Sequence, residues 1–308
     1  NPWLAEQEDQ ARLDLAQLVA EGDRLAFSTD SYVIDPLFFP GGNIGKLAIC
    51  GTANDVAVSG AIPRYLSCGF ILEEGLPMET LKAVVTSMAE TARAAGIAIV
   101  TGDTKVVQRG AADKLFINTA GMGAIPANIH WGAQTLTAGD VLLVSGTLGD
   151  HGATILNLRE QLGLDGELVS DCAVLTPLIQ TLRDIPGVKA LRDATRGGVN
   201  AVVHEFAAAC GCGIELSEAA LPVKPAVRGV CELLGLDALN FANEGKLVIA
   251  VERNAAEQVL AALHSHPLGK DAALIGEVVE RKGVRLAGLY GVKRTLDLPH
   301  AEPLPRIC

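Results

Sequence analysis

The chain has 308 residues, of which 49% are hydrophobic and 20% charged, so it can build one large core or two ordinary ones and is not disordered as a whole. Its net charge of −11 argues against sequence-independent nucleic-acid binding and against docking on anionic membranes. Seven cysteines without a CxxC pair favour free thiols in a reducing cytoplasm over a disulfide framework or a zinc site.

The N-terminal part of the sequence alternates between helical and strand periodicity. Apolar residues recur at helical spacing over 4–20, which predicts an amphipathic first helix. The strands expected in this part cover 25–34, 65–72, 97–101 and 115–125. The further helices expected here cover 46–60 and 78–95. An acidic turn is expected at Gly102-Asp103, directly after the third strand.

The pattern restarts near 136–140, which predicts a domain boundary there and a second α+β unit beyond it. The strands expected in this unit cover 141–145, 188–192, 213–216, 247–251, 273–279 and 284–287. The helices expected cover 152–162, 171–183, 199–209, 225–234 and 254–264. Beyond 287 the periodicity ends, and Pro299, Pro303 and Pro305 predict an extended, flexible tail.

Four aspartates stand where expected strands or helices meet glycine-rich loops. A single Asp before Gly is usually a turn or N-cap residue, so only the set carries an indication. Magnesium on a triphosphate requires several hard oxygen ligands, and carboxylates from separate segments supply them. The set therefore favours a site for ATP and Mg²⁺. Asp35 and Asp150 could exchange roles with aspartates of the set. The four are Asp30, Asp55, Asp103 and Asp193.

Several neighbouring residues suit phosphate groups. Thr195, Arg196 and Gly197 precede an expected helix, whose N-terminus favours anions. Lys46 and Lys105 could neutralise phosphate charge as point cations. The run GTLGDHG at 146–152 is either a plain strand–helix turn or a nucleotide contact. A Walker A pattern and a GxGxxG at the first strand–helix turn are both missing, which disfavours a P-loop enzyme and a dinucleotide fold.

Two residues are candidates for covalent or acid–base chemistry. Glu244 precedes Gly245 at a strand entrance and is either a general base with a raised pKa or a solvated loop acid. Cys308 ends the Pro-rich tail, where it is either an accidental terminal residue or a mobile thiol that can be delivered to a pocket. We interpret Cys210 and Cys212 as half-buried thiols, and His264 and His266 as a helix cap.

Six segments, in order along nearly the whole chain, resemble the HypE family of hydrogenase expression/formation proteins. The terminal PRIC is the most specific of them. The wider superfamily includes aminoimidazole ribonucleotide synthetase, selenophosphate synthetase and thiamine monophosphate kinase. The six segments are STDSYVIDPLFFPGGNIGKLA (28–48), GTANDVAVSG (51–60), TGDTKVV (101–107), RDATRGGV (192–199), NFANEGK (240–246) and PRIC (305–308).

The resemblance implies an α+β, two-domain fold of the aminoimidazole ribonucleotide synthetase type. Residues 1–138 would form a mixed-sheet domain that dimerises and binds ATP. Residues 139–298 would form an α/β sandwich, and 299–308 the flexible tail ending in Cys308. Members of the family usually carry a Gly-rich stretch before the first helix. Since it is missing here, weaker ATP binding is expected.

The resemblance also implies a reaction. Asp30, Asp55, Asp103 and Asp193 match nucleotide–magnesium positions, and Lys46 matches a phosphate-side position. A HypF-type carbamoyltransferase would load a carbamoyl group onto Cys308. ATP would phosphorylate the carboxamide oxygen, and loss of phosphate would leave a thiocyanate, which supplies cyanide for the iron of [NiFe]-hydrogenase. Glu244 would be the base, and Lys105 would stabilise the developing oxyanion.

The resemblance implies three partners: a HypF-type carbamoyltransferase, a HypC–HypD-type iron scaffold and a second copy of this chain. Two other functions compete with this one. A kinase or synthetase for a free small molecule would use the same aspartates but would not need Cys308. A non-catalytic, cysteine-tailed carrier would show no magnesium-dependent ATP turnover.

Overall fold

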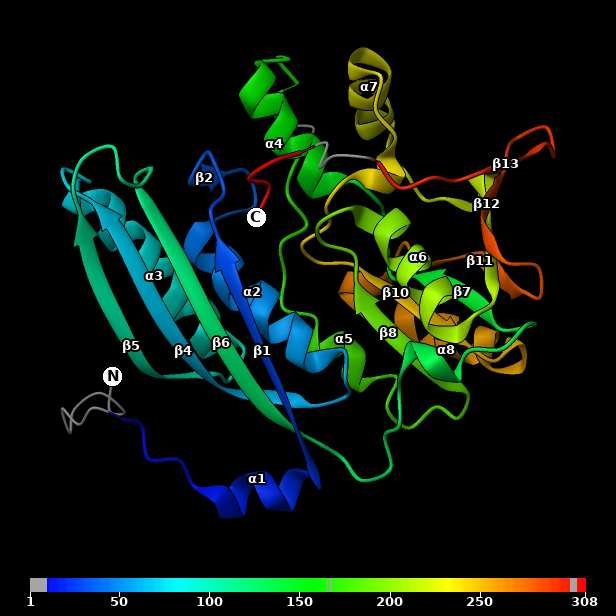
Figure 1. Ribbon diagram of the computed structural model, residues 1–308, viewed down its shortest axis with the longest axis horizontal. Helices are drawn as coiled ribbons and strands as arrows, with labels where there is room; N and C mark the ends of the chain where they lie inside the picture. The colour runs from blue at the N-terminus through cyan, green and yellow to red at the C-terminus, as the bar shows by residue number, and fades with distance from the viewer. Residues whose placement is uncertain (1–9, 165, 167, 300–303) are drawn as a thin grey trace.

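Two β-sheets, each covered by helices, lie side by side with helix α2 (Ile44–Ala57) between them (Figure 1). The computed structural model describes residues 10–164, 166, 168–299 and 304–308. Twelve of the fourteen α2 residues are buried, because the helix packs on the first sheet, on α3 and on elements of the second half. Its many small residues suit a helix that is enclosed on all sides.

The first sheet has four strands in the order β1-β6-β4-β5, and all neighbours are antiparallel except β4 and β5. Helices α2 and α3 (Met78–Ala94) cover one face. On the other face, which we call the open face, α1 (Leu15–Glu21) covers only one end. The strands are β1 (Arg24–Tyr32), β4 (Ile62–Glu73), β5 (Ala98–Val107) and β6 (Leu115–Ile125). A short hairpin, β2 (Phe38–Phe39) and β3 (Gly42–Asn43), precedes α2.

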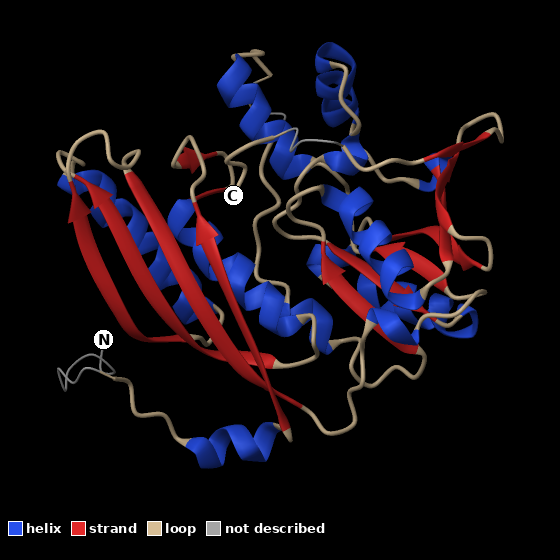
Figure 2. Ribbon diagram, viewed as in Figure 1, coloured by secondary structure: helices blue, strands red, loops and turns tan. Residues whose placement is uncertain are grey.

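The second sheet has seven strands in the order β13-β12-β9-β11-β7-β10-β8, between two layers of helices (Figure 2). Its strands are β7 (Val141–Val144), β8 (Val188–Asp193), β9 (Gly213–Ser217), β10 (Leu247–Val251), β11 (Ala273–Val279), β12 (Gly283–Ala287) and β13 (Lys293–Thr295). Its α-helices are α4 (Asp150–Glu160), α5 (Thr176–Gln180), α6 (Gly198–Cys210), α7 (Pro225–Leu234) and α8 (Ala256–His264). Short 3₁₀ turns are η2 (Ala133–Thr135), η3 (Glu218–Ala220), η4 (Ala238–Asn240), η5 (Arg253–Ala255) and η6 (Pro267–Gly269).

Most expected elements are present, but several differ in extent. In the described part of 4–20, only Leu15 onward is helical, since Asp14 caps α1 by accepting from the Ala16 N–H at 2.9 Å. The expected helix over 171–183 is reduced to α5, because the Asp171 side chain instead holds the backbone of the 244–245 loop. Strand β5 continues to Val107 through parallel pairing with β4, so the turn expected at Asp103 is wrong.

The end of the chain also differs from the expectation. Strand β13 was not expected, because Lys293–Thr295 is short and polar. After β13 the chain crosses back toward the first sheet, where residues 304–308 are docked near the end of β1 (Figure 1). No helix in the described ranges is both long and apolar enough to cross a bilayer.

Candidate functional site

Three of the expected aspartates meet between the two sheets. Asp30 lies on β1 and Asp55 on α2, within the strand and helix expected there, and Asp193 is the last residue of β8, one residue beyond the expected strand. The Ser28 hydroxyl donates to Asp55 Oδ2 at 2.7 Å. Burial raises the pKa of Asp193 to about 7, and the negative charges of Asp55 and Asp30 add to the effect. Burial and Asp30 likewise raise the pKa of Asp55.

This carboxylate cluster fits a cation held jointly with a ligand. Asp193 Oδ2 is buried without a hydrogen-bond partner, and three mutually repelling carboxylates gain from a positive charge between them. In the described part of the chain, no three His, Cys, Asp or Glu side chains form a ready metal cage. Magnesium is usually held by one or two carboxylates together with substrate phosphates, so the cluster suits a magnesium–nucleotide better than a bare ion.

Glu244 lies beside this cluster in the loop before β10. Its side chain is only 2% exposed, and Oε1 has no hydrogen-bond partner, so the solvated-loop alternative is wrong. Burial raises the pKa of Glu244 well above its usual range, and Cys172, Asp171 and Asp193 raise it further. Burial therefore favours the protonated form of this carboxyl.

The backbone around Glu244 is fixed by Asp171, which sequence reasoning missed. Asp171 accepts from the Glu244 N–H at 3.0 Å and from the Gly245 N–H at 3.2 Å. A Cβ at residue 245 would lie 1.9 Å from the Asp171 carbonyl oxygen, so only glycine permits this approach. Burial is the largest single influence and would raise the pKa of Asp171, but Lys246, His151 and the Glu244 N–H together outweigh it, and the pKa is lowered. Lys246 ends the NFANEGK segment, but no spacing rule marked it as a functional residue.

The phosphate-side candidates lie at two helix N-termini. Lys46 is in the first turn of α2 and donates to the Gly41 carbonyl at 2.8 Å. Thr195, Arg196 and Gly197 form the turn between Asp193 and α6, as expected. Gly197 has φ +78°, which favours glycine. In the GTLGDHG run, Asp150 is ion-paired with Lys224 at 2.9 Å, away from the carboxylate cluster.

Asp103 and Lys105 are not brought to the cluster within one chain. In the pairing of β5 with β4, Asp103 lies opposite Gly69 and Lys105 opposite Ile71, and these positions are on the open face. Asp30 is on the other face of the sheet, toward α2. Strands β5 and β1 are opposite edges of the sheet, three strand spacings or about 14 Å apart. Lys105 and Asp103 form an ion pair at 2.7 Å, with side chains 71% and 67% exposed.

Cys308 lies at the inner end of the docked tail and is half-buried. Its carbonyl accepts from the Val33 N–H at 2.9 Å. The preceding Ile307 is 2% exposed, and its carbonyl accepts from His151 Nε2 at 2.8 Å. Cys308 packs against the same apolar cluster as Cys172, the neighbour of Asp171. A short chain of contacts connects the docked tail to the Glu244 loop, because His151 also bonds the Ser170 hydroxyl, which accepts from the N–H of Cys172, the residue after Asp171.

The remaining candidates have structural roles. His266 caps η6 by accepting from the Leu268 N–H, as the cap interpretation expected, whereas His264 bonds the Ala272 carbonyl just before β11 and caps no helix. Cys210 and Cys212 are half-buried free thiols. Asp35 is ion-paired with Lys114 at 2.7 Å and does not join the carboxylate cluster.

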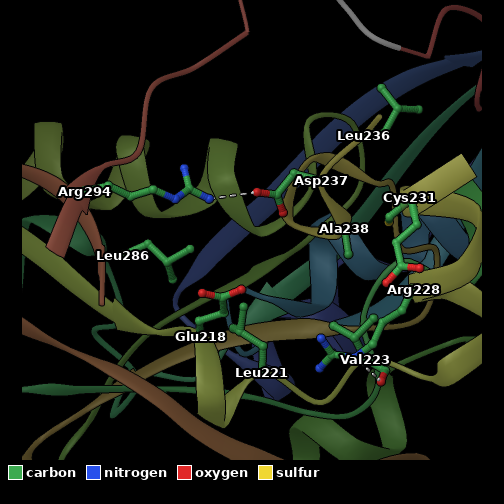
Figure 3. A pocket seen from close by; sticks show the side chains of 11 residues that line it. Glu218, Leu221, Val223, Arg228, Cys231, Leu236, Asp237, Ala238, Leu286 and Arg294 are labelled. Carbon is green, nitrogen blue, oxygen red and sulfur yellow. Dashed lines mark hydrogen bonds and ion pairs between the residues drawn. The ribbon is translucent and has the colours of Figure 1, made fainter. Parts of the chain in front are cut away.

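A separate pocket of about 260 Å³ opens in the second half (Figure 3). Residues of η3, α7, η4, β12 and β13 line it, and an ion pair between Arg294 and Asp237 borders it. It shares no residue with the carboxylate cluster or with the tail contacts.

Comparison with known proteins decides the family. Residues 7–125 match the N-terminal domain of AIR synthase related proteins, and residues 137–288 match the C-terminal domain. Carbamoyl dehydratase HypE of Rhodobacter capsulatus is 50% identical over 98% of this chain and 89% of its own length. The chain belongs to the HypE family. The two-domain α+β fold that the resemblance implied is thereby confirmed.

Solved structures of HypE proteins agree. That of E. coli HypE is 98% identical, has a TM-score of 0.98, and covers all of this chain and 96% of that one. A HypE solved in complex with ATP is 46% identical with a TM-score of 0.94, covering all of this chain and 92% of that one. A HypE from a HypE–HypF complex is also 46% identical, with a TM-score of 0.87, covering 97% of this chain and 96% of that one.

Proposed function

We propose that this chain is a carbamoyl dehydratase that converts an S-carboxamide on its own Cys308 into a thiocyanate at the expense of ATP. The observation that carries the proposal is the docking of the tail that ends in Cys308 on His151, which is linked through Ser170 to the Asp171–Glu244 loop, with Glu244 beside Asp193 and Asp30. This reaction requires a thiol carrier, a buried acid–base group and a nucleotide site with carboxylates that can hold magnesium.

The reaction balances without an external oxidant or reductant. The carboxamide oxygen attacks the γ-phosphorus of ATP, and the bond to ADP breaks. The amide nitrogen then loses its two protons, and the carbon–oxygen bond breaks as inorganic phosphate leaves. The product is R–S–C≡N, with ADP and phosphate. Passing the nitrile as cyanide to the iron of [NiFe]-hydrogenase, with release of the Cys308 thiolate, would then consume two electrons supplied by the iron scaffold that accepts the cyanide.

We assign Asp30, Asp55 and Asp193 to magnesium-bound ATP, and Lys46 with the Thr195–Gly197 turn to its phosphates. Bound magnesium would neutralise the triphosphate and favour transfer of the γ-phosphoryl group. Glu244 would accept a proton from the amide nitrogen. Because burial and acidic neighbours raise the pKa of Glu244, positive charge nearby would favour the carboxylate form that a base requires.

A second copy of the chain would complete the site. Lys105 and Asp103 lie on the open face, where Leu25, Phe27 and Ile71 expose large apolar side chains. Packing two open faces together would bury these side chains and carry Lys105 toward a neighbour's tail. We therefore assign Lys105, as oxyanion stabiliser, to the homodimer.

A HypF-type carbamoyltransferase is the proposed source of the carbamoyl group, supported by the complex formed by a HypE relative. A HypC–HypD-type scaffold is the proposed cyanide acceptor. Seven free cysteines agree with a cytoplasmic setting for these steps.

Intact-protein mass spectrometry tests the function. The full chain is incubated with the carbamoylating partner, carbamoyl phosphate and magnesium–ATP, with Cys308→Ala alongside. We expect a carbamoyl mass on Cys308 that then decreases by one water only when ATP can be hydrolysed. A small-molecule kinase would be indicated if Cys308→Ala retained full ATP turnover, and a mere carrier if the carbamoyl mass never decreased.

A further inference from the structure

We propose that the end of β1 and the outer turns of α4 form a peptide-binding site for the last five residues, with Arg159 as its main positioning residue. We call this site the tail seat and define it by Val33, Asp35, His151 and Arg159. The proposal explains how the thiol of the proposed function is placed. Its own evidence is the set of contacts around residues 304–308.

Arg159 joins three main-chain carbonyls with one guanidinium group. Its Nε donates to the Asp35 carbonyl at 2.6 Å, and Nη1 donates to the Pro305 carbonyl at 2.8 Å. Its Nη2 donates to the Arg306 carbonyl. Only arginine offers several N–H donors in one rigid plane, so it can hold the tail and the end of β1 together at fixed spacing.

The tail also bonds the main chain of the segment that follows β1. The Val33 N–H donates to the Cys308 carbonyl at 2.9 Å, and the Asp35 N–H donates to the Arg306 carbonyl at 3.4 Å. The two pairs run in opposite directions along the chain, which is antiparallel pairing. Recognition of an extended peptide by main-chain hydrogen bonds at a strand is a general binding mode.

His151 bonds the carbonyl of Ile307, the residue between these two pairs. A carbonyl can only accept, so His151 Nε2 must carry the hydrogen that bonds Ile307. Its Nδ1 then accepts from the Ser170 hydroxyl at 2.7 Å. Burial lowers the pKa of His151, which favours this neutral form. The ring packs edge-on against Phe39, with ring centroids 5.3 Å apart.

Side chains of the tail add specificity. Leu304 and Ile307 are buried as apolar anchors. Arg306 Nε donates to the Val33 carbonyl at 2.8 Å, and Nη1 pairs with Asp113 at 2.7 Å. Arg306 adopts φ +54°, a conformation that L-residues rarely take and that these contacts must hold. The tail seat therefore recognises a peptide ending in Pro-Arg-Ile-Cys through its main chain and through the side chains of Leu304, Arg306 and Ile307.

The test measures tail release in the full chain. Wild type, Arg159→Ala and Arg159→Lys are treated with iodoacetamide, and the alkylation of Cys308 is followed by peptide mass spectrometry. Loss of two charge-assisted hydrogen bonds to the tail predicts a rise in the alkylation rate of about tenfold for alanine. The lysine variant should fall between, because a point cation can keep one contact. The matched control is Arg281→Ala, an exposed arginine far along the second half.

Hydrogen exchange separates tail release from general loosening. In Arg159→Ala we expect faster exchange in the tail and at 33–35, with unchanged exchange in β7 and β10. A second variant, Asp113→Asn, removes the half-exposed partner of Arg306 and should raise Cys308 alkylation about threefold without disturbing the core. Cys308 alkylation within twofold of wild type in both variants overturns the proposal.

Neither readout involves ATP or a carbamoyl donor, so the tail seat and the proposed function can fail separately. If Cys308 is never carbamoylated but Arg159→Ala frees the tail, the tail seat stands and the dehydratase does not. If dehydration proceeds at the wild-type rate in Arg159→Ala while the alkylation rates match, the dehydratase stands and Arg159 has no positioning role.

Discussion

The Lys246 ammonium lies 3.2 Å from Asp171 Oδ2, in an ion pair whose side chains are only 11% and 3% exposed. Asp171 in turn holds the backbone N–H groups of Glu244 and Gly245. The pair thus fixes the loop on which the proposed base stands.

Removing one member of this pair should cost far more stability than removing both. Lys246→Met leaves a buried, uncompensated carboxylate, and we expect the free energy of unfolding to decrease by about 3–5 kcal/mol. Urea unfolding at pH 7 measures it. The double variant Lys246→Met/Asp171→Leu should recover part of the loss. Because the pKa of Asp171 is lowered on folding, its stabilisation is present above its unfolded pKa and is lost as pH falls through the folded value. Equal losses in the single and double variants would show that the ion pair is unimportant.

Glu244→Gln should abolish dehydration without lowering stability. Glutamine has the shape of the protonated carboxyl but cannot accept the amide proton, so we expect the single-turnover rate to fall at least about 100-fold. The pKa of Glu244 is raised on folding, so the folded state binds an extra proton and stability decreases as pH rises above the unfolded pKa. Glutamine cannot ionise, so the variant lacks this loss of stability at high pH. The variant should therefore melt at the same temperature as wild type in acid and at a higher one at pH 8. A variant that still dehydrates the loaded tail would exclude Glu244 as the base.

Asp193 should make magnesium–ATP binding depend on pH. Its pKa is raised to about 7, and a cation prefers the ionised form, so affinity should weaken as pH falls below 7. Calorimetric titration at pH 6, 7 and 8 measures the trend. Asp193→Asn should bind more weakly and lose most of the pH dependence. Because it also relieves repulsion by Asp55 and Asp30, it should melt at a higher temperature without nucleotide. A pH profile identical to wild type would place the cation elsewhere.

Lys105 should act across the dimer. Lys105→Ala is expected to fold normally, because its ion pair with Asp103 is exposed, but to be inactive. Mixing it with Cys308→Ala should restore activity. Half of the randomly formed dimers are mixed and each contains one intact site, so about one quarter of wild-type activity is expected. Single-turnover dehydration of the mixture measures this. No recovery after verified subunit exchange would place Lys105 and Cys308 of one chain in the same site.

Regular elements with strong periodicity could be predicted from the sequence. The expected bounds 115–125, 225–234, 247–251 and 273–279 coincide with β6, α7, β10 and β11. These segments combine a clear apolar pattern with turn residues at both ends. Their local preference and their tertiary environment agree, so one pattern suffices.

The failures arise where distant side chains decide. Asp103 follows a glycine and suggests a turn, but pairing with β4 extends the strand through it. The tail contains three prolines and suggests free chain, but Arg159, 146 residues from Pro305, holds its carbonyls. Sequence distance conceals such a contact. Cys308 and Glu244 were candidates from their positions in the sequence, and the resemblance gave them roles, whereas Asp171, His151 and Arg159 act on the backbone and carry no spacing signature.

The tail joins the two halves of the molecule a second time. It leaves the seven-stranded sheet at β13 and is hydrogen-bonded to the end of β1 in the four-stranded sheet, apart from the connection through 126–140. While docked, residues 304–308 bond Val33 and Asp35 of the first half and His151 and Arg159 of the second, so five residues at the end of the chain tie both halves to one another.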